Sequence, residues 1–522
     1  MTNRIMVQGT GSGVGKSVIV AALCRIFTKD GYKVAPFKSQ NMALNSYVTK
    51  DGLEIGRAQA FQAFAARKEP TVEMNPILLK PTSDIGAQVI VRGKPIGNMT
   101  AKEYHEYKPK ALNLIKDCFE KLERENDIVV IEGAGSPAEV NLRENDIVNM
   151  CIAKLLNAPV LLLGDIDKGG VFAWIVGTLE LLEAEEKALV KGILINKFRG
   201  DLDILTPGLE FLERRVGKPV LGVIPYFQDI KVQEEDSLSV EKGKIRTAGK
   251  VEDKEITIEV VYLPHISNFT DLDVLEAEND VSMRYVGKGE KIGEPDVIII
   301  PGSKNTIGDL SYLKEKGYAL DIVKKARSGK CVVFGICGGY QILCNSLIDP
   351  EGVESKLREI EGLGLLPATT IFESHAQKMT NQVRAIADLE FYKGEIAGYE
   401  IHMGRTYFSN GVTKNAFTIF ERSGEKVPDD GGGAVSSDGN VIGTYIHGIF
   451  DNDGFRRAFL NHVRQKKGLP LLSIDENKSE SECNGIDWDT EYNKLADLVR
   501  SNIDMSKVYG IINEKAKLDE HV

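Results

Sequence analysis

Residues 9–17 read Gly-Thr-Gly-Ser-Gly-Val-Gly-Lys-Ser and lie between a β-rich apolar run and a helical pattern. Glycines at such a junction let successive backbone N–H groups face phosphate oxygens, and the helix N-terminus adds the positive end of its dipole. We expect Gly13 and Gly15 to shape this cradle. Lys16 would then reach the β- and γ-phosphates of ATP, and Ser17 would bind Mg²⁺. An ordinary glycine-rich turn is the competing interpretation, which the Gly-Lys-Ser ending disfavours.

The alternation of strand-like runs and helical patterns continues up to residue 230. It predicts strands at 4–8, 33–37, 127–132, 159–164, 192–196 and 220–224. With helices between them, such strands form a mostly parallel sheet covered on both faces. A second series of strands is predicted at 256–262, 296–300, 331–335, 434–436 and 441–445. The chain is therefore predicted to be an α/β protein with two domains.

The boundaries follow from changes in composition along the chain. We place the first domain at 1–230 and the second at 255–465. Between them, 231–254 is charged and lacks periodicity, which is typical of a linker or a peripheral hairpin. A C-terminal tail occupies 466–522, and apolar residues on one stripe predict an amphipathic helix at 487–508.

Composition excludes several classes of protein. Of 522 residues, 42% are apolar and 27% charged, and the formal net charge is −11. This acidic balance argues against a general nucleic-acid binder. No apolar run approaches the ~20 residues of a membrane span, and no signal peptide is recognised. The seven cysteines are dispersed without a CxxC pair, so we expect a reducing, cytoplasmic location.

Polar residues end three of the predicted strands in the first half. Glu132 precedes a tight glycine turn and is predicted to bind Mg²⁺, because the carboxyl ends of parallel strands meet at one edge. A surface charge at the strand end is the alternative. Asp165 and Asp167 follow another apolar strand and would bind metal or shape the substrate pocket. Asn196 precedes a lysine in a dipeptide that is expected to contact adenine.

The second half carries a candidate nucleophile. Residues 332–341 read Val-Val-Phe-Gly-Ile-Cys-Gly-Gly-Tyr-Gln, a strand-like run that ends in Gly-x-Cys-Gly-Gly and enters a helix. Such a nucleophile elbow exposes Cys337 on a strained turn, and the next backbone N–H can hold an oxyanion. The helix N-terminus favours thiolate. A buried structural cysteine is the competing interpretation.

A thiol nucleophile needs a base and an acid that orients the base. His447 ends a predicted strand and is our candidate base, with His402 as its competitor. The pairing resembles class I glutamine amidotransferases, which carry His-x-Glu, whereas Ile449 stands at the acid position here. The site is then a dyad, or another acid serves, for which Glu400 and Asp451 are candidates. The flavodoxin-like fold of that class is expected for the second domain.

The segment 299–306 reads Ile-Ile-Pro-Gly-Ser-Lys-Asn-Thr, a strand followed by a glycine turn. It is a candidate donor of the second oxyanion N–H and a candidate contact for L-glutamine.

The phosphate loop resembles that of dethiobiotin synthetase, because Thr10 replaces the first glycine of the strict P-loop. Partition ATPases carry a signature lysine where Gly11 stands here, which weakens the resemblance to them.

Both halves in this order resemble the glutamine-hydrolysing cobyrinate amidotransferases of cobalamin synthesis. Four stretches resemble the cobyric acid synthases of that family: 37–46 (Phe-Lys-Ser-Gln-Asn-Met-Ala-Leu-Asn-Ser), 54–59 (Glu-Ile-Gly-Arg-Ala-Gln), 75–81 (Asn-Pro-Ile-Leu-Leu-Lys-Pro) and 164–172 (Gly-Asp-Ile-Asp-Lys-Gly-Gly-Val-Phe). The resemblance implies amidation of carboxylates b, d, e and g of adenosylcobyrinic acid a,c-diamide to give adenosylcobyric acid. ATP would form an acyl phosphate at each, and glutamine would release ammonia at Cys337.

Two alternatives stay open at this point. One is the family member that forms the a,c-diamide itself. The other, from a different class, is a nucleotide-switched ATPase that binds a protein partner and carries a degenerate second domain. We also expect no membrane or nucleic-acid partner, and leave a homo-oligomer open. Asp146, in the segment 144–149, is a candidate at the substrate site, with a helix cap as the competing interpretation.

Overall fold

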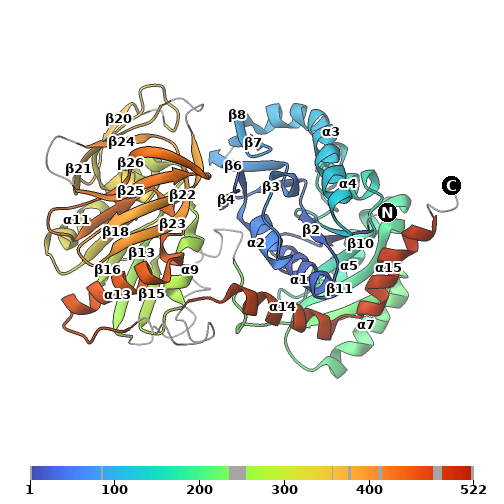
Figure 1. The fold of residues 1–522 in the computed structure, drawn as a ribbon. Coiled ribbons are helices and arrows are strands. Elements are labelled where there is room, and N and C mark those ends of the chain that lie inside the picture. The colour runs from blue at the N-terminus through green and yellow to red at the C-terminus, as the bar shows by residue number, and fades with distance from the viewer. Residues whose placement is uncertain are drawn as a thin grey trace.

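The computed structural model describes residues 3–83, 86–233, 254–355, 357–373, 378–408, 414–473 and 485–518. Two α/β lobes lie side by side (Figure 1). The first lobe comprises the described residues up to 233 together with 485–518, and the second comprises those between 254 and 473. Most of the predicted linker lies outside the described residues.

The first lobe is built on six parallel strands in the order β12-β11-β10-β1-β9-β2. Their bounds are β1 (Asn3–Gly9), β2 (Val34–Phe37), β9 (Ile128–Glu132), β10 (Val160–Asp165), β11 (Val190–Phe198) and β12 (Val220–Pro225). All six predicted strands are therefore present, and the parallel sheet is confirmed. The carboxyl ends of β1, β9 and β10 meet at one edge, where the phosphate loop leaves β1.

Helices cover both faces of this sheet, as predicted. One face carries α1 (Lys16–Lys29), and the opposite face carries α3 (Ala101–Glu125), α4 (Met150–Leu155), α5 (Val171–Leu181) and α7 (Leu202–Val216). In β1, Ile5 and Val7 pack toward the α1 side and Met6 toward the other. This alternation is the period of two that a strand buried on both faces produces.

The C-terminal tail returns to the first lobe. Two helices, α14 (Trp488–Asn502) and α15 (Met505–Leu518), pack beside α1 in the same apolar layer (Figure 1). A single helix at 487–508 was predicted, but the helix stops where Ile503 becomes extended and pairs with Gly222. The backbone N–H of Asp504 donates to Leu221 at 2.7 Å, so tertiary pairing with β12 breaks the helical pattern.

Between β2 and α3 the chain forms small elements that face the second lobe. These are β3 (Gln40–Met42), β4 (Ser46–Val48), β5 (Glu54–Gly56), α2 (Arg57–Ala65), β6 (Ile77–Ser83), β7 (Gly86–Val91) and β8 (Lys94–Thr100). β4 and β5 form an antiparallel hairpin, and β5 runs directly into α2. Figure 1 shows β4 and β6 opposite β22 and β23 of the second lobe. The end of the motif at 37–46 thus lies at the contact between lobes, where the N–H of Ser46 donates to Asn268.

The second lobe has a ten-stranded sheet in the order β15-β13-β16-β18-β27-β26-β25-β22-β23-β28. Its parallel half comprises β15 (Val281–Val286), β13 (Ile256–Val261), β16 (Val297–Ile300), β18 (Val332–Ile336) and β27 (Val441–Thr444). Its antiparallel half comprises β26 (Glu425–Val435), β25 (Lys414–Arg422), β22 (Met379–Asp388), β23 (Lys393–His402) and β28 (Ile446–His447). The parallel half confirms the predicted α/β class, whereas the strand predicted at 434–436 is only the end of the longer β26.

The remaining elements surround these sheets. They are α6 (Ala184–Leu189), β14 (Ile266–Ser267), η3 (Phe269–Leu272), α9 (Asp273–Glu276), β17 (Gly302–Ser303), α10 (Thr306–Glu315), α11 (Tyr318–Arg327), α12 (Gly338–Leu343), β19 (Cys344–Ile348), β20 (Glu359–Glu361), β21 (Leu366–Ile371), β24 (Arg405–Phe408) and α13 (Asp453–Lys466). Among the helices that the structure describes, none is long and apolar enough for a membrane crossing.

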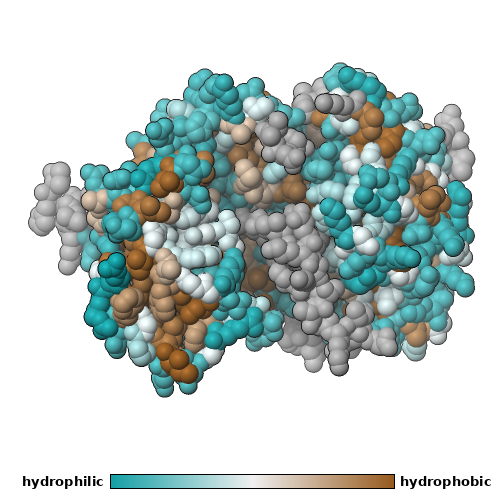
Figure 2. Space-filling model, turned by 180° about the vertical axis from the view of Figure 1, so that it is seen from behind, coloured by the Kyte–Doolittle hydropathy of each residue, from teal (hydrophilic) through white to brown (hydrophobic). Residues whose placement is uncertain are grey.

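Exposed apolar side chains on α5 and α7 of the first lobe include Trp174, Ile204 and Phe211, and Figure 2 shows apolar surface gathered on that lobe. The oligomeric state stays a prediction.

Candidate active site

The phosphate loop has the backbone that its glycines predict. Gly13 and Gly15 adopt positive φ values of 69° and 100°, and α1 begins at Lys16. A side chain at position 15 would also meet Asn196, because an added Cβ would lie 2.4 Å from its Nδ2. The Nζ of Lys16 donates to the carbonyl oxygens of Gly11 at 2.9 Å and Gly135 at 3.1 Å. The ammonium therefore lies over the loop, on the side where β9 ends.

Glu132 ends β9 directly beside Ser17. Its side chain is 1% exposed, which excludes the interpretation as a surface charge. The Ser17 hydroxyl donates to it at 2.8 Å, the Lys38 ammonium at 2.9 Å and the Gln62 amide at 2.5 Å. A buried carboxylate next to a hydroxyl at a phosphate loop offers the oxygen ligands that Mg²⁺ takes alongside nucleotide phosphates. The described residues contain no cluster of three or more His, Cys, Asp or Glu suited to a metal.

Asn196 lies beneath the loop. Its side chain is buried and donates to the carbonyl of Val14 at 2.8 Å, against the face of Gly15. The amide therefore supports the loop backbone. Contact with adenine, which the dipeptide predicted, stays a prediction.

The carboxylates after β10 are both paired. Asp165 is buried and accepts from Lys197 at 2.9 Å, and Lys197 also donates to the loop carbonyl of Gly13 at 2.7 Å. Asp167 pairs with Arg199 at 3.0 Å on the surface. Asp165 thus holds Lys197 against the phosphate loop, whereas Asp167 pairs with an arginine outside it.

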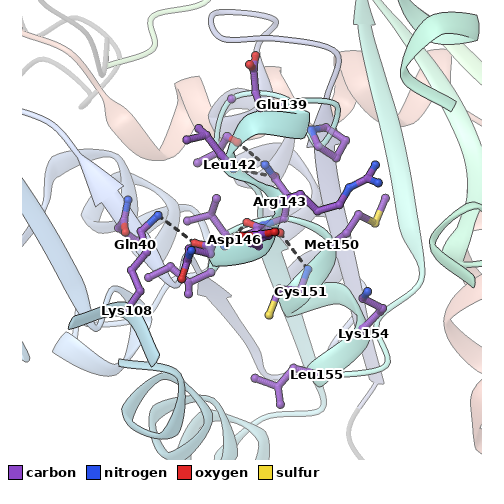
Figure 3. A pocket seen from close by; sticks show the side chains of 18 of the residues that line it. Gln40, Lys108, Glu139, Leu142, Arg143, Asp146, Met150, Cys151, Lys154 and Leu155 are labelled. Carbon is purple, nitrogen blue, oxygen red and sulfur yellow. Dashed lines mark hydrogen bonds between the residues drawn. The ribbon is translucent and has the colours of Figure 1, made fainter. Parts of the chain in front are cut away.

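A cavity of about 730 Å³ opens beside Gly135, at the β9 side of the loop (Figure 3). Its lining is largely apolar, with the basic side chains of Lys108, Arg143 and Lys154 around it. Asp146 also lines it, but one carboxylate oxygen accepts from the N–H of Val148 at 2.8 Å and the other from that of Cys151 at 2.9 Å. Asp146 therefore anchors the backbone before α4, and the cavity wall depends on it.

Cys337 occupies a strained turn between β18 and α12. Its φ is 52° and its ψ is −106°, a conformation that non-glycine residues rarely adopt. An added Cβ at Gly339 would lie 1.9 Å from the carbonyl oxygen of Ile300, and one at Gly338 would lie 2.8 Å from the amide nitrogen of Ser303. The two glycines thus let the turn sit against the segment 299–306, which brings backbone N–H groups beside the thiol.

The candidate base His447 lies against Asp271, which occupies the place of an orienting acid. The Nδ1 of His447 lies 2.6 Å from Asp271 Oδ2, and the N–H of Gly448 donates to Oδ1 at 3.1 Å. Burial lowers the pKa of His447, but Asp271 and the thiol of Cys337 outweigh burial and raise this pKa to about 10. An imidazole held by a carboxylate at Nδ1 leaves Nε2 for the thiol, which is the geometry of a triad.

The site is therefore not a dyad in this structure, and neither Glu400 nor Asp451 is the acid bonded to His447. Glu400 is buried and pairs with Arg422 at 2.8 Å, which satisfies its charge away from His447. Asp451 ends the short helical turn Ile449–Asp451, and the partner of His447 Nδ1 is Asp271 instead. The competing base His402 stacks on Tyr445 with ring centroids 3.7 Å apart, and its Nε2 lies 3.7 Å from Oε1 of Glu400, a longer separation than the 2.6 Å between His447 and Asp271.

A small cavity of about 30 Å³ touches the thiol and reaches the contact between lobes. It is lined by Ser303, Lys304, Gln341, Glu354 and Lys378, and also by Lys80 from the first lobe. Glu54 lies between the two lysines of the contact, 2.8 Å from Lys80 and bonded to Lys378. Burial, together with Lys80 and Lys304, lowers the pKa of Lys378 to about 7 against the attraction of Glu54.

Comparisons with known proteins agree with these two sites. A family model described as the CobQ/CobB/MinD/ParA nucleotide binding domain matches residues 5–240, and the CobB/CobQ-like glutamine amidotransferase domain matches residues 257–455. Cobyric acid synthase of Alkaliphilus metalliredigens is 53% identical over 518 residues, covering 98% of this chain and 100% of the relative. Its counterpart in Thermoanaerobacter sp. is 54% identical over 522 residues, covering 98% and 99%. The chain belongs to the cobyric acid synthase family.

Family membership confirms a glutamine-hydrolysing amidating enzyme of cobalamin synthesis with a nucleotide-binding domain. The structure places the predicted Lys16, Ser17 and Glu132 together at one site, whereas Asp271, which lies beside the predicted His447, was not singled out in the sequence. The segment 266–280 before β15 contains several acids, and nothing in the sequence indicates which of them meets a distant histidine.

Proposed function

We propose that this chain amidates carboxylates b, d, e and g of adenosylcobyrinic acid a,c-diamide, with ATP and L-glutamine, to give adenosylcobyric acid. The observation that carries the proposal is the combination of two sites in one chain. A phosphate loop lies beside the buried Glu132, and Cys337 lies beside the His447–Asp271 pair. Identity of 53% over nearly the full length to cobyric acid synthases supports the choice of substrate.

In the first lobe, a substrate carboxylate attacks the γ-phosphorus of ATP, the bond to the β,γ-bridging oxygen breaks, and ADP leaves behind an acyl phosphate. Lys16 and the backbone N–H groups of the loop stabilise charge on the transferring phosphoryl group. Ser17 and Glu132 would hold Mg²⁺, which neutralises phosphate charge. Lys38, bonded to Glu132 at 2.9 Å, adds a second cation at this end of the loop. Ammonia then attacks the acyl carbon, and phosphate leaves.

In the second lobe, His447 accepts the thiol proton, and the thiolate of Cys337 attacks the glutamine amide carbon. The N–H groups of Gly338 and Ser303 lie beside the turn and are the proposed oxyanion donors. The imidazolium returns its proton to the departing ammonia, and Asp271 stabilises that imidazolium throughout. Water then hydrolyses the thioester and releases glutamate.

The cavity beside Gly135 is the proposed corrinoid site. It adjoins the loop at the carbonyl that Lys16 contacts, so an acceptor carboxylate there is close to the transferring phosphate. Its apolar lining suits a macrocycle. Two of the basic side chains at its edge pair with acids of the same lining, Arg143 with Glu183 at 2.8 Å and Lys154 with Glu186 at 3.2 Å, so a substrate carboxylate would have to compete with these acids.

Product analysis tests the proposal. The purified chain is incubated with ATP, Mg²⁺, glutamine and adenosylcobyrinic acid a,c-diamide, and amides are counted by mass spectrometry. Four new amides are expected. A chain that amidates cobyrinic acid but leaves the a,c-diamide unchanged would be the a,c-diamide-forming enzyme instead. A chain that never hydrolyses glutamine, even with all substrates present, supports the nucleotide-switch alternative.

A further inference from the structure

The β4–β5 hairpin of the first lobe rests on the strand that borders the thiol site. The backbone N–H of Ser46 donates to Asn268 Oδ1 at 2.8 Å, and its carbonyl accepts from the Tyr399 hydroxyl at 3.4 Å. Val48 on the same strand packs with Tyr399 and Ile401 in a small buried apolar cluster. One short strand of the nucleotide-binding lobe therefore holds two side chains of the glutaminase lobe.

These two side chains support the two members of the His447–Asp271 pair. Asn268, with φ of 52°, directly precedes η3, the single turn that contains Asp271. Tyr399 is the cross-strand partner of His447, and their rings stack with centroids 5.2 Å apart and planes 18° apart. A displacement of Ser46 would thus act on both the acid and the base.

The hairpin β4–β5 and the helix α2 that follows it form one unit, and the α2 end of this unit contacts the phosphate-loop site. β5 continues without a break into α2, where the Gln62 amide donates to Glu132 at 2.5 Å and to the carbonyl of Ser17 at 3.3 Å. The hairpin itself is braced, because the buried Glu54 accepts from the Ser46 hydroxyl at 2.8 Å. A braced hairpin that is continuous with a helix transmits a shift more readily than a loose loop does.

We propose that the β4–β5–α2 unit couples the two sites, so that filling the phosphate-loop site changes the placement of His447 and Asp271 and hence the rate of glutamine hydrolysis. Asn268 and Tyr399 are the positioning residues of this coupling. The inference rests on the proposed function and deepens it. Triad geometry is sensitive to such shifts, since displacements of about 1 Å can cost about 10²-fold in rate.

The test uses the full chain and the double variant Asn268→Gly/Tyr399→Phe, which removes both bonds to Ser46. Glycine tolerates the positive φ at 268, and phenylalanine keeps the ring stacked on His447. The matched control is Thr380→Val, which removes a 2.8 Å bond from the second lobe to Gly52 of the same hairpin but does not touch the triad supports.

Glutamine hydrolysis is measured with and without ATP, Mg²⁺ and the corrinoid acceptor. We expect stimulation of about tenfold or more in the wild type and in Thr380→Val, and about twofold or less in the double variant. Synthesis from external ammonia should stay within about twofold in all three. Alkylation of Cys337 by iodoacetamide gives a second readout, and its rate should respond to nucleotide only where the hairpin contacts remain.

Undiminished stimulation in the double variant would overturn the coupling. So would an equal loss of ammonia-dependent synthesis, because that indicates a general structural role. If the wild type hydrolyses glutamine at one rate under all conditions, the coupling fails while the proposed function stands. If it hydrolyses none, the proposed function itself fails.

Discussion

The two chemical sites of this chain are built in different ways. The phosphate-loop site is largely local, because one strand–turn–helix segment supplies the cradle, Lys16 and Ser17, and a single further strand adds Glu132. The thiol site is assembled from separate segments: Cys337 on one turn, His447 at a strand end and Asp271 on the helical turn η3. A local site can be recognised from one motif, whereas an assembled site requires the fold.

The largest expected effect separates the two sites. Cys337→Ala should lower glutamine-dependent synthesis by about 10⁵-fold or more, because no other group supplies the nucleophile. Synthesis from high external ammonia should persist, since the first lobe is untouched. Both rates are measured on the same preparation, and parallel loss of the two would show that the sites are not independent.

The next effect concerns the assembled site. Asp271→Asn should lower the kcat of glutamine hydrolysis by about 10³–10⁴-fold, because the imidazole loses its orienting carboxylate. Glu400→Gln is the matched control, as Glu400 pairs with Arg422 and should matter far less. Steady-state kinetics give the kcat of glutamine hydrolysis for both variants. A larger loss in Glu400→Gln than in Asp271→Asn would show that Glu400, not Asp271, is the orienting acid.

A smaller loss is expected at the local site. Lys16→Ala should lower synthesis by about 10²–10³-fold with either glutamine or ammonia as the nitrogen source, because the phosphoryl group loses a positive partner. The readout is ADP formation with each nitrogen source. Normal turnover in this variant would show that Lys16 of the phosphate loop takes no part in the reaction.

The strained turn makes a prediction about stability. Gly339→Ala should lower the free energy of unfolding by about 1–3 kcal/mol, because the new Cβ would lie 1.9 Å from the Ile300 carbonyl. Gly177→Ala in α5 is the control, since no atom lies within 4 Å of its added Cβ. Chemical unfolding monitored by circular dichroism compares them. Equal stabilities would mean that the turn has room to relax.

The smallest effect is a dependence on pH. The pKa of His447 is raised to about 10 in the folded chain, above the ordinary value of 6.5. Its contribution to stability is therefore fully present below about pH 6.5 and is lost as pH rises toward 10. The difference in unfolding free energy between wild type and His447→Gln should shrink between pH 7 and 10. A constant difference would show that His447 is not held protonated by Asp271.

Periodicity and glycine placement determined much by themselves. They predicted the six parallel strands of the first lobe, the elbow at Cys337 and the cradle around Lys16, because strand period and turn conformation depend on neighbouring residues. Of the antiparallel half of the second sheet, the sequence predicted only the strand at 434–436, which is the end of β26. The strands of this half pair with segments that are distant in the chain, and such pairing leaves little local signal.

Tertiary structure alone decided the rest. It placed Asp271 against His447, ended α14 at Ile503 by pairing with Gly222, and set Ser46 between Asn268 and Tyr399. In each case the deciding partner is remote in sequence, so its identity follows from how the lobes and layers pack. The sequence by itself determined which chemistry each half carries, and the packing of the two lobes decided how those halves meet.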